Sequence, residues 1–197
     1  MGIQTTILCP VNATGGGHYR AGGKATGLTT LAAGAPVFSF RWINTGLLAV
    51  VHKVAWGWFL STAFGAAQIV DHGLYKATGF SASDTGGSAL TATPKRAGAM
   101  NPLVAADFDM RIGAISAGTR TLAADHVGAR GAWGSAVGAN LMPGVVMEFE
   151  QHKESHLYLG PNEGLVLCNI TLMGASGVLA LYVDIAFSTV KPENALF

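Results

Sequence analysis

Apolar and polar residues alternate along much of the chain from residue 36 onward, which is the period-two pattern of half-buried strands. The clearest example is PVFSFRW at residues 36–42, where an aromatic residue occupies every second position. LLAVVHKVAWGWFL at 47–60 is a longer run that is rich in β-branched and aromatic residues. We predict strands at residues 36–42, 47–60, within 61–80, and at 106–115, 141–149, 156–159, 163–173 and 178–190.

Short and long connections separate these strands. Asn44–Gly46 and Gly160–Asn162 have the composition of tight turns, and GASG at 174–177 predicts a hairpin between the last two strands. Residues 81–102 and 116–140 form two long loop-like stretches that are rich in glycine and alanine. Because no stretch carries a convincing helical period, we predict an all-β fold of about eight strands, an antiparallel sandwich of the jelly-roll kind.

Three regions differ in texture along the chain. Residues 1–35 contain glycine, alanine and threonine at high density, so they bury little and are costly to order, and we predict an extended N-terminal arm there. The arm either lies along a neighbouring molecule or is a loose terminus. Residues 36–190 form the predicted sandwich domain, and 191–197 a polar C-terminal tail.

Charge is scarce: 12% of the residues are charged and 50% are hydrophobic, against roughly 25% charged in an ordinary soluble domain. Interface cores are depleted of charge, so this composition favours a chain that hides much of its surface against other subunits. The alternative is a compact monomer with a Ser/Thr/Asn surface. The net charge is +1 with no basic stripe, so we expect no direct nucleic-acid binding.

Nothing in the sequence predicts insertion into a membrane or export. The run at 47–60 is shorter than the roughly 20 residues that span a bilayer and is interrupted by His52 and Lys53. The N-terminus lacks the basic and apolar regions of a signal peptide.

Candidate chemistry is thin. His152 and His156 are four residues apart, but the segment crosses a predicted turn, so we interpret them as solvated residues rather than a metal pair. Asp107 and Asp109 share a strand face with Arg111, which favours an exposed, charge-balanced face over an acid–base pair. No GxSxG motif is present. We predict no catalytic, cofactor or metal site, and hence not an enzyme.

Two further residue types remain open. Cys9 and Cys168 lie far apart, and two buried thiols are favoured over a disulfide. Aromatic residues dominate interface energetics, so the four tryptophans are candidate contacts with other subunits. Trp56 and Trp58 share one strand face, which also fits a carbohydrate-binding sandwich. The candidate interface residues are Trp42, Trp56, Trp58 and Trp133.

Six short segments, made of turns and strand starts, occur in a characteristic order: GHYR at 17–20, AAGAPVFSFRW at 32–42, SASDTGGSALT at 81–91, AGTRTLAA at 117–124, LGPNEGLVLCN at 159–169 and DIAFSTV at 184–190. In this order of features the chain resembles a group of tailed-bacteriophage virion proteins of about this length, although it carries fewer charges. The resemblance implies a capsid decoration (cement) protein, located in the virion and assembled in the host cytoplasm. Its partners would be copies of itself and the major capsid protein or other virion proteins; a tail, baseplate or fibre component is the alternative.

Overall fold

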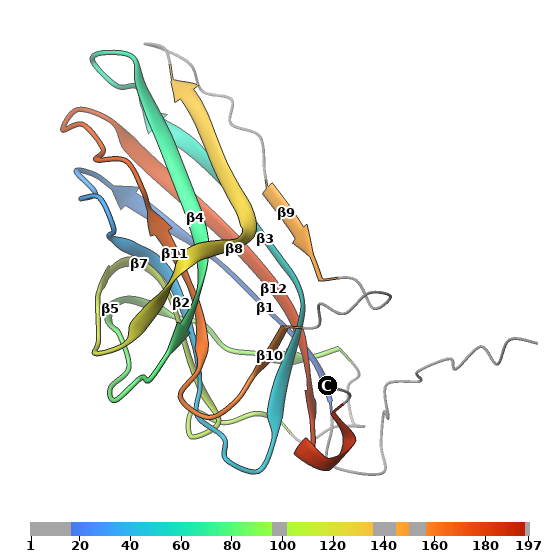
Figure 1. Cartoon of the computed structure of the whole chain (residues 1–197). Coiled ribbons are helices and arrows are strands. Elements are labelled where there is room, and N and C mark those ends of the chain that lie inside the picture. Colours follow the sequence, from blue (N-terminus) through green and yellow to red (C-terminus); the bar gives the residue numbers. More distant parts are fainter. Residues whose placement is uncertain (1–16, 96–101, 136–144, 150–156, 196–197) are drawn as a thin grey trace, which may run out of the picture.

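The computed structural model of the chain describes residues 17–95, 102–135, 145–149 and 157–195. Within these ranges it is an all-β protein in which two antiparallel sheets pack face to face, as Figure 1 shows. The predicted antiparallel sandwich is therefore confirmed. The C-terminal η1 (Pro192–Asn194) is a single short 3-10 turn. No helix in the described ranges has the length and apolarity to cross a bilayer.

Sheet A is built around β3 and β12, two long strands that pair with each other along most of their length. Its spatial order is β10 (Leu157–Leu159), β3 (Leu48–Thr62), β12 (Val178–Val190), β1 (His18–Leu28) and β6 (Thr93–Pro94), and β9 (Val145–Glu148) also pairs with β3.

Sheet B lies across from it and contains the strand with the densest burial, β11. Its spatial order is β5 (Thr85–Ala89), β7 (Phe108–Ser116), β2 (Pro36–Trp42), β11 (Gly164–Asn169), β4 (Gln68–Thr78) and β8 (Thr121–Ser135). All six residues of β11 are buried, because both of its faces are covered.

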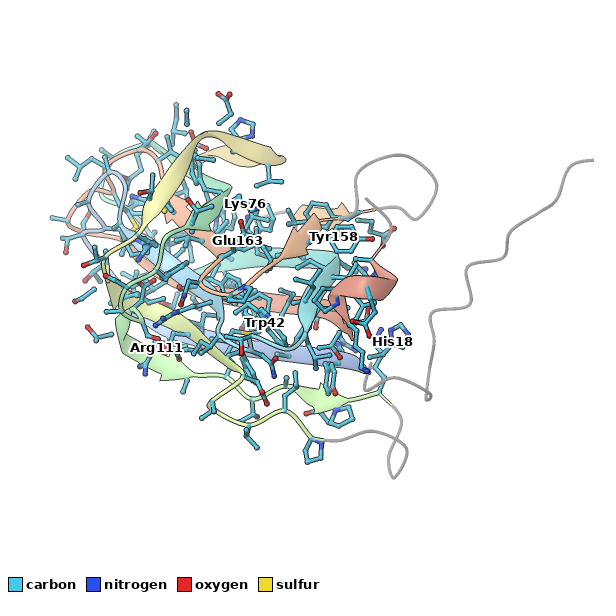
Figure 2. All side chains as sticks on the ribbon, turned by 60° about the horizontal axis from the view of Figure 1, so that its bottom comes forward. His18, Trp42, Lys76, Arg111, Tyr158 and Glu163 are labelled. Carbon is cyan, nitrogen blue, oxygen red and sulfur yellow. The ribbon has the colours of Figure 1, made fainter. Side chains whose placement is uncertain are left out.

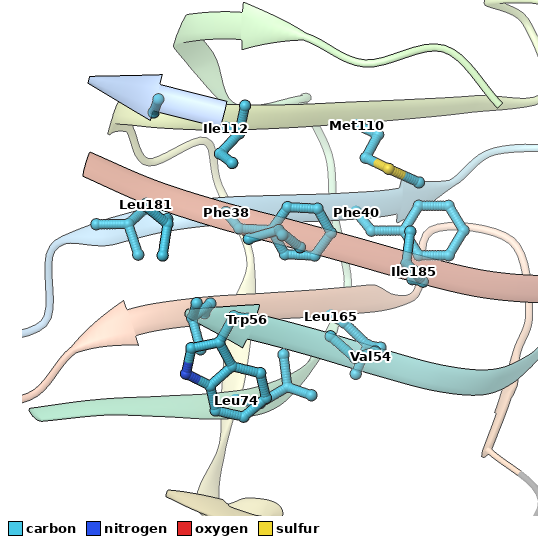
Figure 3. Packing of buried hydrophobic residues seen from close by; sticks show 14 of the residues in the cluster. Phe38, Phe40, Val54, Trp56, Leu74, Met110, Ile112, Leu165, Leu181 and Ile185 are labelled. Carbon is cyan, nitrogen blue, oxygen red and sulfur yellow. The ribbon is translucent and has the colours of Figure 1, made fainter. Parts of the chain in front are cut away.

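The core lies between the inner faces of the two sheets, where each strand contributes every second side chain. In Figure 3, Phe38 and Phe40 of β2 lie with Leu181 and Ile185 of β12 in this space, and Trp56 of β3 lies beside Leu74 of β4. At one end the Phe40 and Phe187 rings approach to 5.2 Å between centroids. The core therefore accounts for the aromatic alternation that the sequence carries.

The predicted N-terminal arm is wrong for much of its length. Residues 18–28 form β1, which pairs with β12 from His18↔Ser188 to Leu28↔Leu179 and buries Tyr19 and Ala21. A side chain at Gly23 would collide with Leu90, so the close approach of this segment requires a glycine at that position of the strand. Residues 1–16 of the predicted arm lie outside the described residues.

Two other predictions need correction. Residues 121–135, expected as loop, form the 15-residue strand β8 paired with β4. The predicted hairpin at 174–177 is also wrong, because β11 belongs to sheet B and β12 to sheet A. The turn there carries the chain from one sheet to the other, and the Gly177 position leaves no room for a side chain beside the Phe64 ring. Within the other long stretch, 81–102, the short strands β5 and β6 form.

Candidate interaction surface on sheet A

Around β11, the outer face of sheet B is covered by its own chain. Val166 and Cys168 of β11 point to this face, and Phe80 and Leu122 pack over them. Burial raises the pKa of the Cys168 thiol to about 11, so this thiol is protonated and unreactive at neutral pH. Lys76 of β4 lies on the opposite parity, that of Leu74 in the core, and forms an ion pair with Glu163 at an N···O distance of 3.2 Å; both side chains are labelled in Figure 2. This face therefore offers no open apolar surface at β11.

A buried ion pair closes one end of this covered face. Asp84 and Arg120 pair with side-chain exposures of only 1% and 4%, and Asp84 Oδ1 also accepts a hydrogen bond from the Gly118 N–H at 2.6 Å. The Arg120 guanidinium lies over the Phe80 ring, 5.6 Å from its centroid, and Arg41 lies 5.8 Å from the same ring. The pair holds two loops together and has no access to a ligand from solvent.

The outer face of sheet A is different, because it carries large apolar side chains that are exposed. Phe59 of β3, Tyr182 of β12 and Val146 of β9 are 45%, 44% and 58% exposed, respectively. The strand registers place them on one face: Ala55 pairs with both Val146 and Asp184, and Tyr182 pairs with Gly57. Exposed apolar groups that cluster in this way mark interaction surfaces more often than scattered ones do.

A shallow hollow of about 760 Å³ lies on this face. Its floor consists of residues with little or no side chain, Gly22, Ala55 and Gly57. Val146 on one side and Thr93–Lys95 on the other border it, and Tyr182 and Asp184 rise from β12 between them. We call this depression the hollow.

The charges around the hollow are largely paired. Arg20 makes two hydrogen bonds to Asp184, at 2.7 and 2.8 Å, and Lys53 lies 3.2 Å from Glu148. The Lys24 ammonium lies 5.2 Å from the centroid of the Tyr182 ring. What remains at the centre is neutral and mostly apolar, so the hollow suits a partner surface without charge.

A Ser–His contact lies at one end of sheet A. His52 Nε2 is 2.7 Å from Ser188 Oγ, and the His18 ring lies 5.8 Å from the His52 ring. Burial and the nearby Lys95 lower the pKa of His18. Ser188 is only 6% exposed, so its hydroxyl links β12 to β3 rather than facing a substrate.

The predicted interface tryptophans are mostly core residues. Trp42, Trp56 and Trp58 are 0%, 2% and 3% exposed, and Trp42 Nε1–H donates to the Leu47 carbonyl at 2.7 Å. Indoles this deeply buried are not available to a partner or to a sugar, since they fill the space between the sheets. The side chain of Trp133 lies outside what the structure describes.

The remaining candidates have structural roles or lie elsewhere. Asp107 accepts from the Asn44 amide at 2.6 Å and from the Val104 N–H at 2.8 Å, so it organises a turn before β7. Asp109 and Arg111 form the predicted charge-balanced pair at 3.2 Å. His152, His156 and Cys9 lie outside the described residues.

Within the described residues, no three His, Cys, Asp or Glu side chains lie close enough together to hold a metal ion.

Sequence reasoning missed the residues of the hollow. The strand at 178–190 carries the feature that could have identified them. Every second residue from 179 to 187 is buried, and Tyr182 lies between two of these, on the other face of the strand. An aromatic residue on the solvent parity of a strand indicates a contact surface, but only after the strand has been assigned to the centre of a sheet.

Comparison of the chain with protein-family models, with curated proteins and with solved structures finds no match.

Proposed function

We propose that this chain is a non-enzymatic structural subunit of a larger protein assembly, and that it contacts neighbouring subunits through the hollow on sheet A. The observation that carries the proposal is the group of exposed apolar side chains on the outer face of sheet A: Val146 and Tyr182 at the hollow, and Phe59 on the same face of β3. The low charge content of the chain, 12%, agrees with a surface that is covered in its working state.

The sequence resemblance supplies the finer proposal, a virion decoration protein that stabilises a capsid by bridging its subunits. The partners would then be other copies and the major capsid protein, and the location would be the virion. A tail, baseplate or fibre component would use the same kind of contact at few positions. The number of copies per particle distinguishes the two, because decoration requires many copies spread over the shell.

A single contact of this size is weak. Fully burying a large apolar side chain stabilises by about 1.5–3 kcal/mol, and these three are already roughly half buried. Together they contribute on the order of 3 kcal/mol before the entropy of association is subtracted. A protein that acts by such contacts depends on repetition, in which many copies on one particle add up through avidity.

The carbohydrate-binding alternative requires an exposed indole platform made by Trp56, Trp58 or Trp133. Trp56 and Trp58 are buried, and the side chain of Trp133 lies outside what the structure describes, so no observation favours this alternative.

The test compares self-association of the full chain with that of two arginine variants. Ala55→Arg places a long cation in the floor of the hollow, and Leu172→Arg places the same charge at a site that is 67% exposed and outside the hollow. Because a single contact is weak, static light scattering is measured without dilution up to millimolar protein concentration and gives the mean mass of each. We expect the mean mass of the wild type and of Leu172→Arg to rise above the monomer value with concentration, and that of Ala55→Arg to stay at the monomer value. A wild type that stays monomeric at every concentration, or equal masses for all three, would falsify the proposal.

A further inference from the structure

We infer that the occupant of the hollow is the N-terminal segment, residues 3–11, of a neighbouring copy of this chain. This inference rests on the proposed function, because it names the partner of the same surface. It combines the chemistry of the hollow with the sequence of residues 1–16 and with the place where the described chain begins.

The segment matches the hollow in charge. MGIQTTILCPVNATGG, residues 1–16, contains no Asp, Glu, Lys or Arg. Of the three charged side chains that line the hollow, Arg20 and Asp184 are paired with each other and Lys95 lies at the border, and the floor is glycine and alanine. An uncharged segment covers this floor without removing an unpaired charge from water, as long as Lys95 at the border stays hydrated.

The segment also has most of its apolar side chains on one face when it is extended. Ile3, Ile7, Cys9 and Val11 fall on odd positions and so project to the same side, whereas Leu8 projects to the other. A glycine and alanine floor leaves room for such side chains, between Val146 and Tyr182. Pro10 has no N–H and disfavours a place in a strand ladder, whereas a segment lying on a sheet face needs no ladder.

The start of the described chain favours a neighbouring copy over the same chain. Gly17 is held at the end of sheet A by two hydrogen bonds with Thr189, at 3.0 and 2.9 Å. To reach its own hollow the chain would have to reverse at this fixed point. Sixteen extended residues reach about 53 Å, whereas the thirteen residues of β12 span about 43 Å. The segment is therefore long enough to cover the sheet of an adjacent subunit.

Cys9 provides a direct test in the full-length protein. The chain has two cysteines, and Cys168 is only 3% exposed. Ala55→Cys places a thiol in the floor of the hollow, and Ser61→Cys places one on the same strand and face, about 20 Å further along. Mild oxidation with diamide joins neighbouring thiols as a disulfide, with diamide reduced to the hydrazine.

The cross-link is read by non-reducing electrophoresis and by mass spectrometry on a mixture of ¹⁴N- and ¹⁵N-labelled chains. We expect Ala55→Cys to give a disulfide between Cys9 and position 55 in which the two peptides carry different labels, at least tenfold more than Ser61→Cys gives. Cys9→Ser in the same background should abolish it. Same-label pairs alone would overturn the neighbouring copy as donor, and equal yields in the two variants would overturn the hollow as the receptor.

A second pair of variants separates this inference from the function on which it rests. Ile7→Asp puts a charge on the odd-numbered face of the segment, and Thr6→Asp puts the same charge on the even-numbered face. We expect Ile7→Asp to weaken self-association at least tenfold more than Thr6→Asp. If Ala55→Arg prevents assembly while the two aspartate variants behave alike, the hollow remains the contact surface and the N-terminal segment is not its occupant. If none of these variants changes the mass, the proposed function fails as well.

Discussion

Replacing Asp84 by alanine leaves Arg120 as a buried cation without its partner. The Arg120 side chain is 4% exposed, and it packs on Phe80 inside the protein. Removing one member of a buried ion pair costs roughly 3–5 kcal/mol, because the remaining charge stays desolvated. Asp84 also accepts the Gly118 N–H, so the Asp84→Ala variant loses a second hydrogen bond. We expect its free energy of unfolding to fall by about 4 kcal/mol, a drop in Tm of roughly 10 °C.

The assay is urea unfolding of a double-mutant cycle with Arg120→Met, which keeps an apolar stem on Phe80. Once both charges are gone, no unpaired ion remains, so the double variant should be more stable than the sum of the two single losses predicts, by at least 2 kcal/mol. The matched control is the exposed pair of Arg20 and Asp184, with side-chain exposures of 64% and 32%, where Asp184→Asn should cost less than about 1 kcal/mol. Additive losses in the cycle, or equal costs for Asp84→Ala and Asp184→Asn, would refute the reasoning.

Three other predictions follow from single positions. Gly164→Ala should destabilise by more than about 2 kcal/mol in thermal unfolding, since its Cβ would collide with the Phe40 carbonyl. Gly46→Ala should cost less than about 1 kcal/mol, since its Cβ would meet only the Asn44 side chain, at an ordinary contact distance. Burial lowers the pKa of His72 from 6.5 to about 4, so the unfolded chain binds the proton more readily than the folded protein does. The free energy of unfolding should therefore fall by up to roughly 3 kcal/mol as the pH drops from 6.5 toward 4. Urea titrations at several pH values should show this dependence for the wild type and not for His72→Gln. Cys168 should resist iodoacetamide at pH 8 until urea unfolds the protein, and alkylation of the native thiol within minutes would contradict its burial.

The strands that could be predicted from the sequence are those with large side chains on one parity. In β2, the alternating residues Phe38, Phe40 and Trp42 lie on the inner face of sheet B. In β12, every second residue from Leu179 to Phe187 lies on the inner face of sheet A. These patterns are local consequences of a pleated strand with one face in a core. Such strands can therefore be predicted from the sequence without knowing which strand they pair with.

The errors arose where tertiary contacts override local pattern. Gly23 in β1 has no side chain because Leu90 and Ile112 occupy that space, so a strand in the interior of sheet A has the composition of a loop. All of β8 was missed, because glycine and alanine separate its few large apolar residues, Leu122, Val127 and Trp133, and no period-two pattern results. The turn at 174–177 was located correctly, but a turn signal does not specify whether the next strand returns to the same sheet.

The candidate site was harder to predict than the fold. Each tryptophan was a reasonable contact residue by type, yet burial depends on which parity faces the other sheet. Tyr182 and Val146 come together only because β9 and β12 flank β3 on opposite sides, which is a feature of sheet order. Their proximity could not be inferred from a sequence separation of 36 residues.

The central claim, that the hollow is a contact surface, is tested most directly by cryo-EM of a native assembly that contains this chain. We expect density from a neighbouring protein over Phe59, Val146 and Tyr182, with Ala55 and Gly57 out of contact with solvent. An assembly in which this face of sheet A points into solvent in every copy would contradict the claim.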